Sequence, residues 1–579
     1  MRIHSIEIPG SKSITNRALI IAAISNGETK LVDALISDDT KHMIAGLKKL
    51  GIKISQNKST IIVNGGMKND YTKPISFFCG NSGTTVRFLS ALAATLKGTF
   101  TFDGDERMRE RPIKDLCDAL VQCGAKVEYL KRNGYAPFRI TGPINNIECN
   151  INGSISSQFL SGLLLAAPNT KHGLSIKILS KQVSRSYIDL TISVMKSFGV
   201  KVREESARYY IEKNERYASQ KKYTVEGDAS SASYIWGISK ITKIPIQITN
   251  ISENSIQPDA KVKQIIETVM NSNNIKTIDC IDFPDAAMTI ASLCALTNTT
   301  CKLTGLQTLR DKECNRIEAL KTELQKLGVK VQSGKDFIKI SGVANFNKSA
   351  KIETYNDHRM AMCFGMIQLA MPKLKITNPK CVSKTFPTFW KEINIINKLS
   401  NDRNIVLLGM RGAGKSSIAV KLGIKLNKKV VDTDREIEKI TKLRIIDIVK
   451  RYGWKKFRQI EKNVINKISK RKKIIISTGG GVVLDNNNII NLRKNGFCIY
   501  LSSTLKNLRS RILMNDERPS ISGNSIILEL PQLLKERRPL YMKASDIIFD
   551  KHDKRSNKRT ELNEKTNELL KIINAHGIS

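Results

Sequence analysis

The chain before residue 400 repeats one arrangement of apolar and polar positions. A helical segment ends at a glycine and passes straight into a short β-like run, and a degenerate copy lies at Asn274–Lys276. Glycine directly after a helix supplies the left-handed residue that ends it. The early copies lie roughly 75 residues apart, which signals internal duplication of a helix–strand unit and predicts a symmetric α/β architecture. The clear copies are Leu50–Ile54, Cys123–Val127, Phe198–Val202 and Leu327–Val331.

A different pattern begins at residue 404. Short apolar runs alternate there with amphipathic helical segments, and this spacing predicts a small doubly wound parallel sheet. The segment 391–403, which turns polar towards its end, is predicted to be a linker. A helix-like tail, Glu561–Ile573, follows a very polar stretch. The predicted strands are Ile405–Leu408, Lys429–Val431, Ile474–Ile476, Cys498–Leu501 and Asp546–Phe549.

Composition places the chain among soluble globular proteins. It has 579 residues, 41% of them hydrophobic and 26% charged, which allows about three or four domains. No apolar run is long enough to span a bilayer, and the N-terminus has no apolar signal region. We therefore expect a cytoplasmic protein without a membrane partner. The 11 cysteines form no CxxC pair and no cluster with histidine, which argues for reduced thiols and against structural zinc.

The formal net charge of +42 has two candidate explanations. Nucleic-acid binding is one, but the lysines are spread along the chain and aromatic residues make up only 6%, which leaves few stacking platforms. Anionic substrates are the other, because they need Arg and Lys concentrated in a cleft. We attribute the charge to compositional bias together with phosphate ligands, and expect no nucleic-acid partner.

A glycine-rich loop, GMRGAGKS, runs from Gly409 to Ser416 between an apolar run and a helix-like segment. Strand, glycine loop and helix form the context of a phosphate-binding P-loop. The glycines let backbone N–H groups converge on phosphate oxygens, and the helix start adds partial positive charge. Lys415 is expected to reach the outer phosphates, and the Ser416 hydroxyl to ligate Mg²⁺.

Several helix starts in the first region combine glycine or serine with basic residues. PGSKSITNR begins at Pro9 and GNSGTTVR at Gly80, and RMRERP, SSQ, PDAAM, KECNR, NDHRM and KTFP follow in order. Cationic groups at helix N-termini suit anionic ligands, and interspersed carboxylates suit proton transfer. Together the motifs indicate an enzyme with two anionic substrates.

These motifs resemble those of 5-enolpyruvylshikimate-3-phosphate (EPSP) synthase, in the same order over about residues 5–390. The resemblance implies two lobes of three helix–sheet units each, with lobe A at 1–9 plus 228–390 and lobe B at 10–227. It also implies transfer of the enolpyruvyl group of phosphoenolpyruvate to the 5-hydroxyl of shikimate 3-phosphate. The implied route is addition then elimination, through a tetrahedral ketal that expels phosphate, with no cofactor.

The resemblance also assigns roles by matching position. Asp285 would take the 5-hydroxyl proton, and Glu313 and Lys12 are candidates for the proton added to the methylene carbon. Gly83, which has no side chain, would leave room beside phosphoenolpyruvate, and inhibition by glyphosate is implied. Phosphoenolpyruvate would be held by Lys12, Arg111, Arg316, Arg359 and Lys384. Shikimate 3-phosphate would be held by Lys12, Ser13, Arg17, Ser156, Ser157, Gln158, Ser184, Tyr187, Asp285 and Lys312.

The region 404–579 is similar to shikimate kinase, through the P-loop, Asp432-Thr-Asp434, the Gly479–Gly481 triplet and later arginine motifs. By matching position, Asp434 would orient or deprotonate the 3-hydroxyl and Asp432 would support Mg²⁺ through water. Arg518 would be a lid arginine over the transferring phosphoryl group. Shikimate would be held by Asp434, Arg458, Gly480, Gly481 and Arg537. ATP would be held by Gly412, Ala413, Gly414, Lys415, Ser416, Ser417, Arg511 and Arg518.

The two resemblances fit one pathway, because the kinase product is the synthase substrate. We expect a two-lobe enolpyruvyl-transferase fold fused to a P-loop kinase, acting as a monomer on shikimate, ATP and phosphoenolpyruvate. Three alternatives remain at this point. The first region could act on a nucleotide sugar, and the second could phosphorylate another polyol or a nucleotide. The whole chain could instead be a basic binding protein without enzyme activity.

Overall fold

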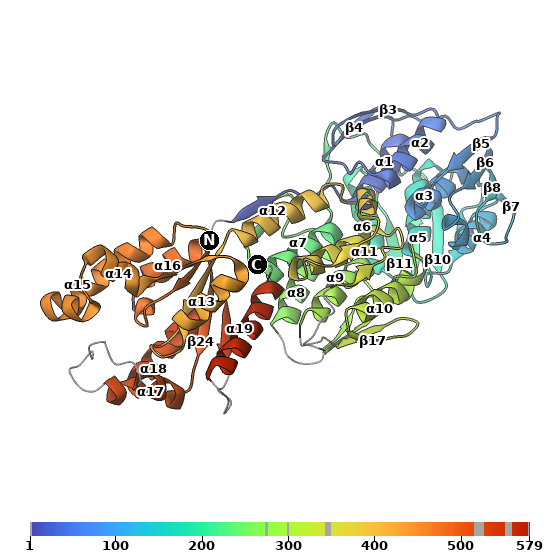
Figure 1. Cartoon of the computed structure of the whole chain (residues 1–579). Helices are drawn as coiled ribbons and strands as arrows, with labels where there is room; N and C mark the ends of the chain where they lie inside the picture. Colours follow the sequence, from blue (N-terminus) through green and yellow to red (C-terminus); the bar gives the residue numbers. More distant parts are fainter. Residues whose placement is uncertain are drawn as a thin grey trace.

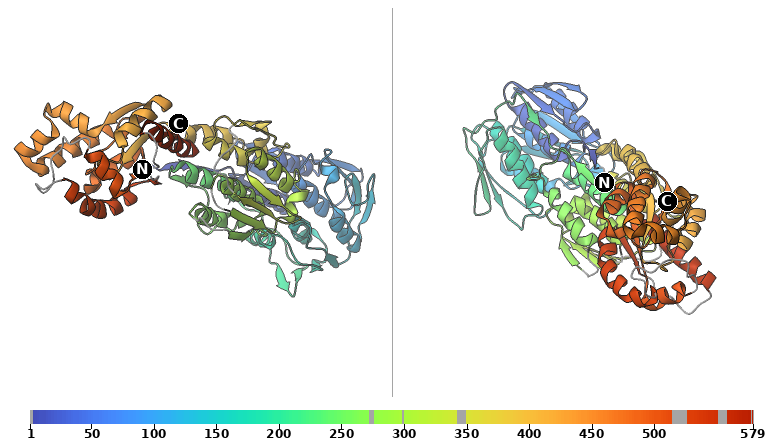
Figure 2. Two further views of the ribbon diagram at one scale, coloured as in Figure 1. Left: turned by 60° about the horizontal axis from the view of Figure 1, so that its bottom comes forward. Right: turned by 90° about the vertical axis from the view of Figure 1, so that its left-hand side faces the viewer.

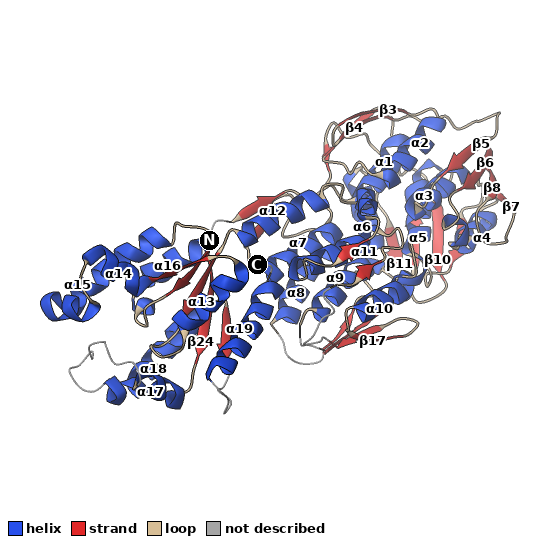
Figure 3. Ribbon diagram, viewed as in Figure 1, coloured by secondary structure: helices blue, strands red, loops and turns tan. Residues whose placement is uncertain are grey.

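The computed structural model describes residues 3–271, 276–297, 300–341, 349–513, 526–550, 558–576 and 578. These residues form an elongated molecule (Figures 1 and 2). Two α/β lobes lie at one end, and a third α/β body, formed by the C-terminal part of the chain, lies at the other. The two lobes alternate helices and sheets as the repeated pattern predicts (Figure 3).

Three four-stranded sheets in residues 28–224 share one topology. In each sheet the first two strands are parallel, and the third and fourth are antiparallel to their neighbours. The sheets are β13(Tyr223–Thr224)-β2(Glu28–Val32)-β4(Thr60–Asn64)-β3(Lys53–Asn57), β5(Ile75–Phe78)-β6(Gly98–Asp103)-β8(Phe138–Gly142)-β7(Lys126–Tyr129) and β9(Glu148–Ile151)-β10(Leu174–Ile178)-β12(Arg208–Ile211)-β11(Arg203–Glu205).

Six helices accompany these sheets in the described residues of lobe B. Three of them, α1, α3 and α5, are apolar around most of their surface and are buried in the middle of the lobe, as expected for helices that pack on every side. The helices are α1(Lys12–Ile24), α2(Asp38–Lys49), α3(Gly83–Ala94), α4(Lys114–Gln122), α5(Ser157–Ala166) and α6(Arg185–Ser197).

Lobe A contains the same unit once in full and twice in reduced form within its described residues. The sheet β15(Lys276–Asp279)-β16(Thr300–Thr304)-β18(Ile338–Ser341)-β17(Lys330–Ser333) repeats the lobe B topology. Two parallel pairs, β1(His4–Ile6)-β14(Ile246–Ile248) and β19(Lys351–Ile352)-β20(Lys375–Ile376), complete the six sheets described before residue 400. The helices are α7(Ala229–Thr242), α8(Val262–Met270), α9(Pro284–Ala295), α10(Arg316–Lys326), α11(His358–Ala370) and α12(Phe389–Asn401).

The glycines at the repeated helix ends confirm their predicted role. Gly51, Gly124, Gly199 and Gly328 all have φ between 83° and 99°, the left-handed region that other residues enter at a cost. Three of them lead directly into β3, β7 and β17, and the strand after Gly199 begins only at Arg203. The degenerate copy at Asn274–Lys276 lies largely outside the described residues.

The segment that we predicted to be a linker, 391–403, is mostly helical. Helix α12 covers Phe389–Asn401, and strand β21(Asn404–Leu408) begins two residues after Asp402. Phe389, Ile393 and Ile396 lie at helical spacing and are buried in the core of lobe A. The polar residues at the end of the segment concealed this apolar stripe in the sequence, and tertiary packing of the stripe stabilises the helix.

The C-terminal region forms the predicted parallel sheet, in the order β22(Lys429–Asp432)-β23(Ile474–Ser477)-β21-β24(Gly496–Ser502)-β25(Ile547–Asp550). All five predicted strands are present, and the predicted tail helix is α19. Helices lie on both faces of the sheet (Figure 3). They are α13(Lys415–Leu426), α14(Thr433–Thr441), α15(Ile445–Ile468), α16(Asn486–Asn495), α17(Leu505–Ile512), α18(Ile526–Ala544) and α19(Lys558–Ala575).

Three hydrophobic clusters lie within the described residues. One extends from Ile14 to Val225, the second joins Ile6 and Ile8 to residues 232–396, and the third extends from Ile405 to Ile578. We propose on this basis lobe B at 10–227, lobe A at 1–9 plus 228–390, and a separate domain from residue 404. Among the described helices, none is long and apolar enough to cross a bilayer.

Candidate active sites

A cleft between the two lobes is lined by the starts of several helices. Lys12 and Ser13 come from α1, Gly83 and Arg87 from α3, and Asp285 from α9. Helix N-termini present free N–H groups and partial positive charge, so a cleft lined by several of them favours anions. Serine caps two of these starts: the Ser11 and Ser82 side chains accept hydrogen bonds from the first turns of α1 and α3.

The structure brings the predicted transferase residues together in this cleft. Lys384 lies beside it, where its Nζ donates to the main-chain oxygen of Asn81 at 3.0 Å and pairs with Glu313 Oε1 at 3.0 Å. These contacts place side chains from both lobes around one space. The predicted residues that line the cleft itself are Lys12, Ser13, Arg17, Gly83, Arg111, Ser156, Ser157, Gln158, Ser184, Tyr187, Asp285, Lys312, Glu313, Arg316 and Arg359.

Arg316 is the most heavily paired cation in the cleft. Its side chain is 1% exposed and contacts Asp285 at 2.8 Å, Glu313 at 2.6 Å and Asp357 at 2.7 Å. A guanidinium has five donors in a fixed fork, so it can hold three carboxylates in a set geometry. Asp357 is fully buried and also caps α11 by accepting from Arg359 N at 2.8 Å. We named its motif from the sequence but gave Asp357 itself no role.

Asp285 is surrounded by basic groups. Arg359 lies 3.0 Å from its Oδ2, and Lys312 lies 3.8 Å from its Oδ1. Burial alone would raise the pKa of Asp285, but Arg359, Lys312 and Arg316 together lower it far below its usual value. Burial would also raise the pKa of Glu313, but nearby cations, first Lys384 and then Arg316, hold it well below its usual value. Both carboxyl groups are therefore ionised at neutral pH in this structure.

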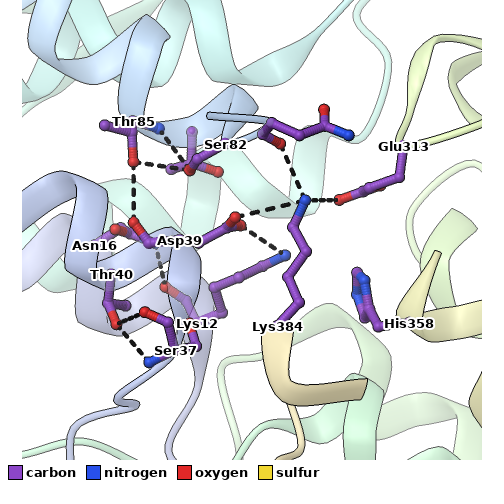
Figure 4. Close-up of polar contacts among 12 residues, drawn as sticks. Lys12, Asn16, Ser37, Asp39, Thr40, Ser82, Thr85, Glu313, His358 and Lys384 are labelled. Carbon is purple, nitrogen blue, oxygen red and sulfur yellow. Dashed lines mark hydrogen bonds and ion pairs between the residues drawn. The ribbon is translucent and has the colours of Figure 1, made fainter. Parts of the chain in front are cut away.

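Asp39, which sequence analysis missed, joins two of the predicted lysines. Its carboxylate lies 3.3 Å from Lys12 Nζ and 3.5 Å from Lys384 Nζ, and Figure 4 shows Lys384 placed between Asp39 and Glu313. Asp39 lies in the first turn of α2, behind a Ser37 capping box. A carboxylate in the first turn of a helix is stabilised by the helix dipole. This explains Asp39 from the sequence alone, and nothing in the sequence indicates its basic partners.

Arg87 is a second cleft residue without a predicted role. Its Nη1 donates to Gln158 Oε1 at 2.7 Å, and its guanidinium lies over the ring of Phe159. Burial lowers the pKa of Arg87 to about 9, with Arg111 adding to the effect. A buried guanidinium beside two predicted ligand residues, Ser156 and Gln158, suits a further anion contact.

Arg17, predicted to hold shikimate 3-phosphate, directs its donors into the protein. Nε donates to Thr191 Oγ1 at 2.8 Å, and Nη1 donates to the main-chain oxygen of Ser13 at 2.9 Å. Nη2 contacts Ser161 Oγ and the main-chain oxygen of Tyr187. Arg17 thus lines the cleft and at the same time ties α1 to α6.

The P-loop adopts the conformation that its glycines predict. Gly412 and Gly414 have φ of 80° and 86°, and Gly414 is the N-cap of α13. Lys415 Nζ donates to the main-chain oxygens of Gly409 at 2.8 Å and Met410 at 2.9 Å, so the lysine folds back over the loop. Arg511 donates from Nη1 to the Gly412 oxygen at 3.3 Å, which places it at the loop as predicted.

The predicted magnesium ligands lie side by side. Ser416 Oγ donates to Asp432 Oδ2 at 2.7 Å, and Ser477 Oγ lies 3.1 Å from Ser416 Oγ. Hydroxyl and carboxylate oxygens are the ligands that Mg²⁺ prefers, and in nucleotide sites the ion keeps waters and phosphate oxygens as its other ligands. The residues present therefore fit Mg²⁺ bound with a nucleotide. The described residues contain no cluster of three or more His, Cys, Asp or Glu that could hold a metal on its own.

A second pocket collects all five predicted shikimate residues: Asp434, Arg458, Gly480, Gly481 and Arg537. The glycine triplet is needed because its backbone passes close to the Asp434 and Arg458 side chains. A Cβ added at Gly479 would lie 2.7 Å from Asp434 Oδ1, and one added at Gly481 would overlap the Arg458 guanidinium. Two side chains of α18 hold the triplet: Arg537 Nη1 donates to the Gly480 oxygen at 3.2 Å, and the Tyr541 hydroxyl donates to the same oxygen.

Glu461 is a pocket residue that sequence analysis missed. It is 1% exposed, and its Oε2 accepts from Arg458 Nη1 at 2.6 Å. Burial raises the pKa of Glu461, and Arg458 opposes this effect. It lies three positions after Arg458 on α15, a spacing that puts both side chains on one helix face.

Arg518 lies outside the described residues.

The comparisons identify two families. Residues 4–393 match the family model for EPSP synthase (3-phosphoshikimate 1-carboxyvinyltransferase), and residues 411–573 match the model for shikimate kinase. A 3-phosphoshikimate 1-carboxyvinyltransferase of Tolumonas auensis is 40% identical over 414 residues, covering 68% of this chain and 96% of that protein. One from Buchnera aphidicola subsp. Cinara cedri is 42% identical over 424 residues, covering 69% and 96%.

A solved structure supports the fold of the first region. EPSP synthase from Acinetobacter baumannii aligns with a TM-score of 0.56 at 22% identity, covering 68% of this chain and 95% of that chain. The two-lobe fold expected from the sequence is thereby confirmed. The two family matches favour the two expected activities over the three alternatives left open by the sequence.

Proposed function

Because this chain belongs to the EPSP synthase family over residues 4–393 and carries a shikimate kinase domain over residues 411–573, we propose that its two sites make and then consume shikimate 3-phosphate. It is a bifunctional enzyme of the shikimate pathway, which leads to the aromatic amino acids. The kinase phosphorylates the 3-hydroxyl of shikimate with ATP. The transferase then converts shikimate 3-phosphate and phosphoenolpyruvate to EPSP and phosphate.

At the kinase site, Arg458 and Arg537 would bind the shikimate carboxylate, because they lie on the same pocket as Asp434 and the glycine triplet. Asp434 would then orient the 3-hydroxyl and accept its proton as the oxygen bonds to the γ-phosphorus of ATP and the bond from that phosphorus to the bridging oxygen breaks, which releases ADP. The P-loop N–H groups, Lys415 and Arg511 would hold the phosphates. Such catalysis consists mostly of positioning and charge neutralisation.

Mg²⁺ would be held by Ser416 directly and by Asp432 through water. When bound, it neutralises charge on the β- and γ-phosphates. Asp432 has a second task in this chain, since its Oδ1 caps α14 by accepting from the N–H groups of Asp434 and Arg435. The cap fixes Asp432 beside Ser416 and sets Asp434 at the helix start.

At the transferase site, the cations would bind the two anionic substrates between the lobes. The 5-hydroxyl oxygen of shikimate 3-phosphate attacks C2 of phosphoenolpyruvate, and its proton passes to Asp285. Lys12 gives a proton to C3, or Glu313 does so once the bound anions have offset its cations and raised its pKa, which yields the tetrahedral ketal. The same group takes a proton back from the new methyl group as the C–O bond to phosphate breaks, which gives EPSP and phosphate. Placed groups of this kind typically add about 10²–10⁴-fold each.

The observation that carries the transferase proposal is the crowding of Arg359, Lys312 and Arg316 around Asp285, which lowers its pKa despite burial. Bound phosphate and carboxylate groups would offset these cations, and the pKa of Asp285 would rise towards that of a working base. The enzyme would prepare its base in this way only when both substrates are present.

A coupled assay tests the proposal with shikimate, ATP and phosphoenolpyruvate. We expect ADP and phosphate to be released in equal amounts. Lys415→Met should stop ADP release and leave phosphate release from added shikimate 3-phosphate unchanged, and Lys12→Met should do the reverse. Absence of either product from the unaltered chain would overturn the corresponding half of the proposal.

We further propose that the enzyme acts as a monomer in the cytoplasm, with Mg²⁺–ATP and small-molecule substrates only. The chain itself contains both predicted sites, and each is built from side chains of this one copy. Analytical ultracentrifugation with and without substrates tests this assembly state. A concentration-dependent dimer would contradict it.

A further inference from the structure

One buried carboxylate at the cleft has no part in the chemistry proposed above. Asp259 lies in a short 3₁₀ helix of lobe A, Pro258–Lys261, and is 2% exposed. Its Oδ2 accepts a hydrogen bond of 2.7 Å from the hydroxyl of Tyr187. Tyr187 belongs to α6 in lobe B and lines the cleft. The bond therefore crosses from one lobe to the other at the wall of the substrate site.

The second oxygen of the Asp259 carboxylate makes its burial unfavourable for the stability of the fold. Oδ1 is buried and has no hydrogen-bond partner among the described residues. A buried carboxylate with a missing partner destabilises a fold, typically by about 1–3 kcal/mol for each unsatisfied group. An apolar or amide side chain would cost less at this position if stability alone mattered. The carboxylate is better explained by what it does to Tyr187.

The surroundings keep Asp259 able to accept this bond at neutral pH. Burial raises its pKa to about 6, and Asp285 adds to the rise while Arg359 opposes it. The carboxylate is thus ionised above this value, and a charged acceptor strengthens the bond from the tyrosine hydroxyl. Burial and the charge of Asp259 also raise the pKa of Tyr187 well above its usual value, so the phenol stays a donor.

Tyr187 is tied to a predicted ligand residue as well as to lobe A. Its main-chain oxygen accepts from Arg17 Nη2 at 3.2 Å and from Thr191 Oγ1 at 2.7 Å. Two neighbours of Tyr187 also cross to lobe A: Ser184 Oγ donates to the Ile281 oxygen at 3.2 Å, and Ser186 Oγ donates to the Asp282 oxygen at 2.8 Å. The start of α6 is thus held against the segment that precedes Asp285.

We propose that Asp259 is a positioning residue of the transferase, which holds the Tyr187 ring against the shikimate 3-phosphate subsite when the lobes come together. Because the bond joins the lobes, it forms only in the closed arrangement and stabilises that arrangement. Tyr187 acts as the contact to the substrate, and Asp259 acts through it. This inference rests on the proposed transferase function.

A double-mutant cycle on the full-length chain tests the inference. Asp259→Ala and Tyr187→Phe should each raise the KM for shikimate 3-phosphate by about tenfold to about hundredfold, the range expected for a bond to a charged group. The effect on kcat should be smaller. The double variant should have a KM no higher than that of the more severely affected single variant, because both changes remove the same bond.

Matched variants separate positioning from general damage. Asp259→Asn keeps an acceptor oxygen but loses the charge, so its KM should lie between that of the unaltered chain and that of Asp259→Ala. Tyr217→Phe removes a buried hydroxyl that donates to the Leu165 oxygen at 3.1 Å within lobe B, and should leave the KM unchanged. Thermal melting of each variant reports whether the transferase lobes have folded, since their hydrophobic clusters are separate from that of the kinase.

The outcomes are distinct. An unaltered chain that releases no phosphate from shikimate 3-phosphate and phosphoenolpyruvate overturns the proposed function, and this inference with it. An active chain whose single variants keep their KM, or whose double variant multiplies the two single effects, overturns the positioning role alone. If the KM of Asp259→Asn is as high as that of Asp259→Ala, the positioning role is likewise overturned.

Discussion

Arg403 donates a hydrogen bond of 3.0 Å to the main-chain oxygen of Thr242, the last residue of α7 in lobe A. From the same guanidinium, Nη2 donates to the Gly496 oxygen of the kinase at 2.8 Å. His576 Nδ1, near the C-terminus, lies 2.8 Å from the Ile241 oxygen. Arg403, at the junction, and His576 of the kinase thus supply partners for the terminal carbonyl groups of α7, whose partial negative charge favours such donors.

We predict that Arg403→Ala uncouples the two enzymes. The substitution leaves the Thr242 and Gly496 oxygens buried without this donor, which should cost about 1–3 kcal/mol. Differential scanning calorimetry with shikimate and ADP checks the coupling. In the unaltered chain these kinase ligands should also raise the melting temperature of the transferase, and in Arg403→Ala they should raise only that of the kinase.

Arg444→Ala serves as the control. Arg444 pairs with Asp447 at 3.1 Å within the kinase, so its loss removes a guanidinium contact that involves neither α7 nor the partners of Arg403. In the control variant, shikimate and ADP should still raise the melting temperature of the transferase as well as that of the kinase. Independent melting of the two parts in the unaltered chain would contradict the prediction.

Gly83→Ala should weaken phosphoenolpyruvate binding. A Cβ at this position would lie 2.8 Å from Arg111 Cζ, so the guanidinium would have to move from the place where it is held by Asn81. We expect a rise in the KM for phosphoenolpyruvate of about tenfold, with a small change for shikimate 3-phosphate. Steady-state kinetics with each substrate varied in turn will check this, with thermal melting of the transferase lobes as the folding control. An equal change in both KM values would count against the placement.

Glu313→Gln should lower the transferase kcat. The amide keeps the shape of the side chain but cannot give or take the proton, so a loss of about 10²–10⁴-fold is expected. Glu318→Gln is the control, since Glu318 follows a few positions later, in the first turn of α10, and pairs with Lys321 at the surface. Rapid-quench measurement of ketal formation would locate the loss. Normal turnover in Glu313→Gln would assign the proton to Lys12.

Acid should destabilise the transferase partly through Asp285. Its pKa in the folded protein is lowered by Arg359, Lys312 and Arg316 despite burial, so the stability it contributes is complete above its unfolded pKa of about 3.9 and is lost as pH falls below that value. Asp285→Asn should melt lower than the unaltered chain at pH 7, and the two curves should converge towards pH 3.

Thermal melting between pH 3 and pH 7 measures this convergence. Asp70→Asn removes an exposed ion pair with Lys97, which contributes little, and should give a curve parallel to that of the unaltered chain. A constant gap between Asp285→Asn and the unaltered chain would show that Asp285 has no part in the acid sensitivity.

Chelation should separate the two activities. EDTA is expected to abolish ADP formation, because Ser416 and Asp432 supply too few protein ligands to retain Mg²⁺ against a chelator. Phosphate release from shikimate 3-phosphate and phosphoenolpyruvate should continue. Excess MgCl₂ should restore the kinase, and a parallel loss of both activities would contradict the assignment of the metal to the kinase alone.

Local signals explain why much of the architecture could be predicted. A glycine after a helix, such as Gly51 or Gly328, acts through its own backbone, and the P-loop around Gly412 and Gly414 does the same. Three of the five apolar runs of the C-terminal region, β21, β23 and β24, are buried on both faces, so their sequences could be recognised as parallel strands. The motif resemblance added the two-lobe fold, which no single stretch of the sequence indicates.

Pairings between distant residues could not be predicted in this way. Lys384 and Asn81 are 303 positions apart, and Asp39, Asp259 and Arg403 lie in segments whose local pattern suggests only a helix start, a turn or a linker. Their partners come from other lobes or another domain. A carboxylate or guanidinium has no particular role until the fold decides which charges surround it.

The sequence alone therefore determined the local elements, the order of the domains and the chemical groups available at each motif, because these depend on neighbours along the chain. Only the tertiary structure decided that helix α12 joins the two enzymes without a flexible linker, that Asp39 and Glu461 line the two pockets, and that Asp259 contacts Tyr187. The reason is that burial and charge pairing are properties of the packed molecule, and long-range contacts set both.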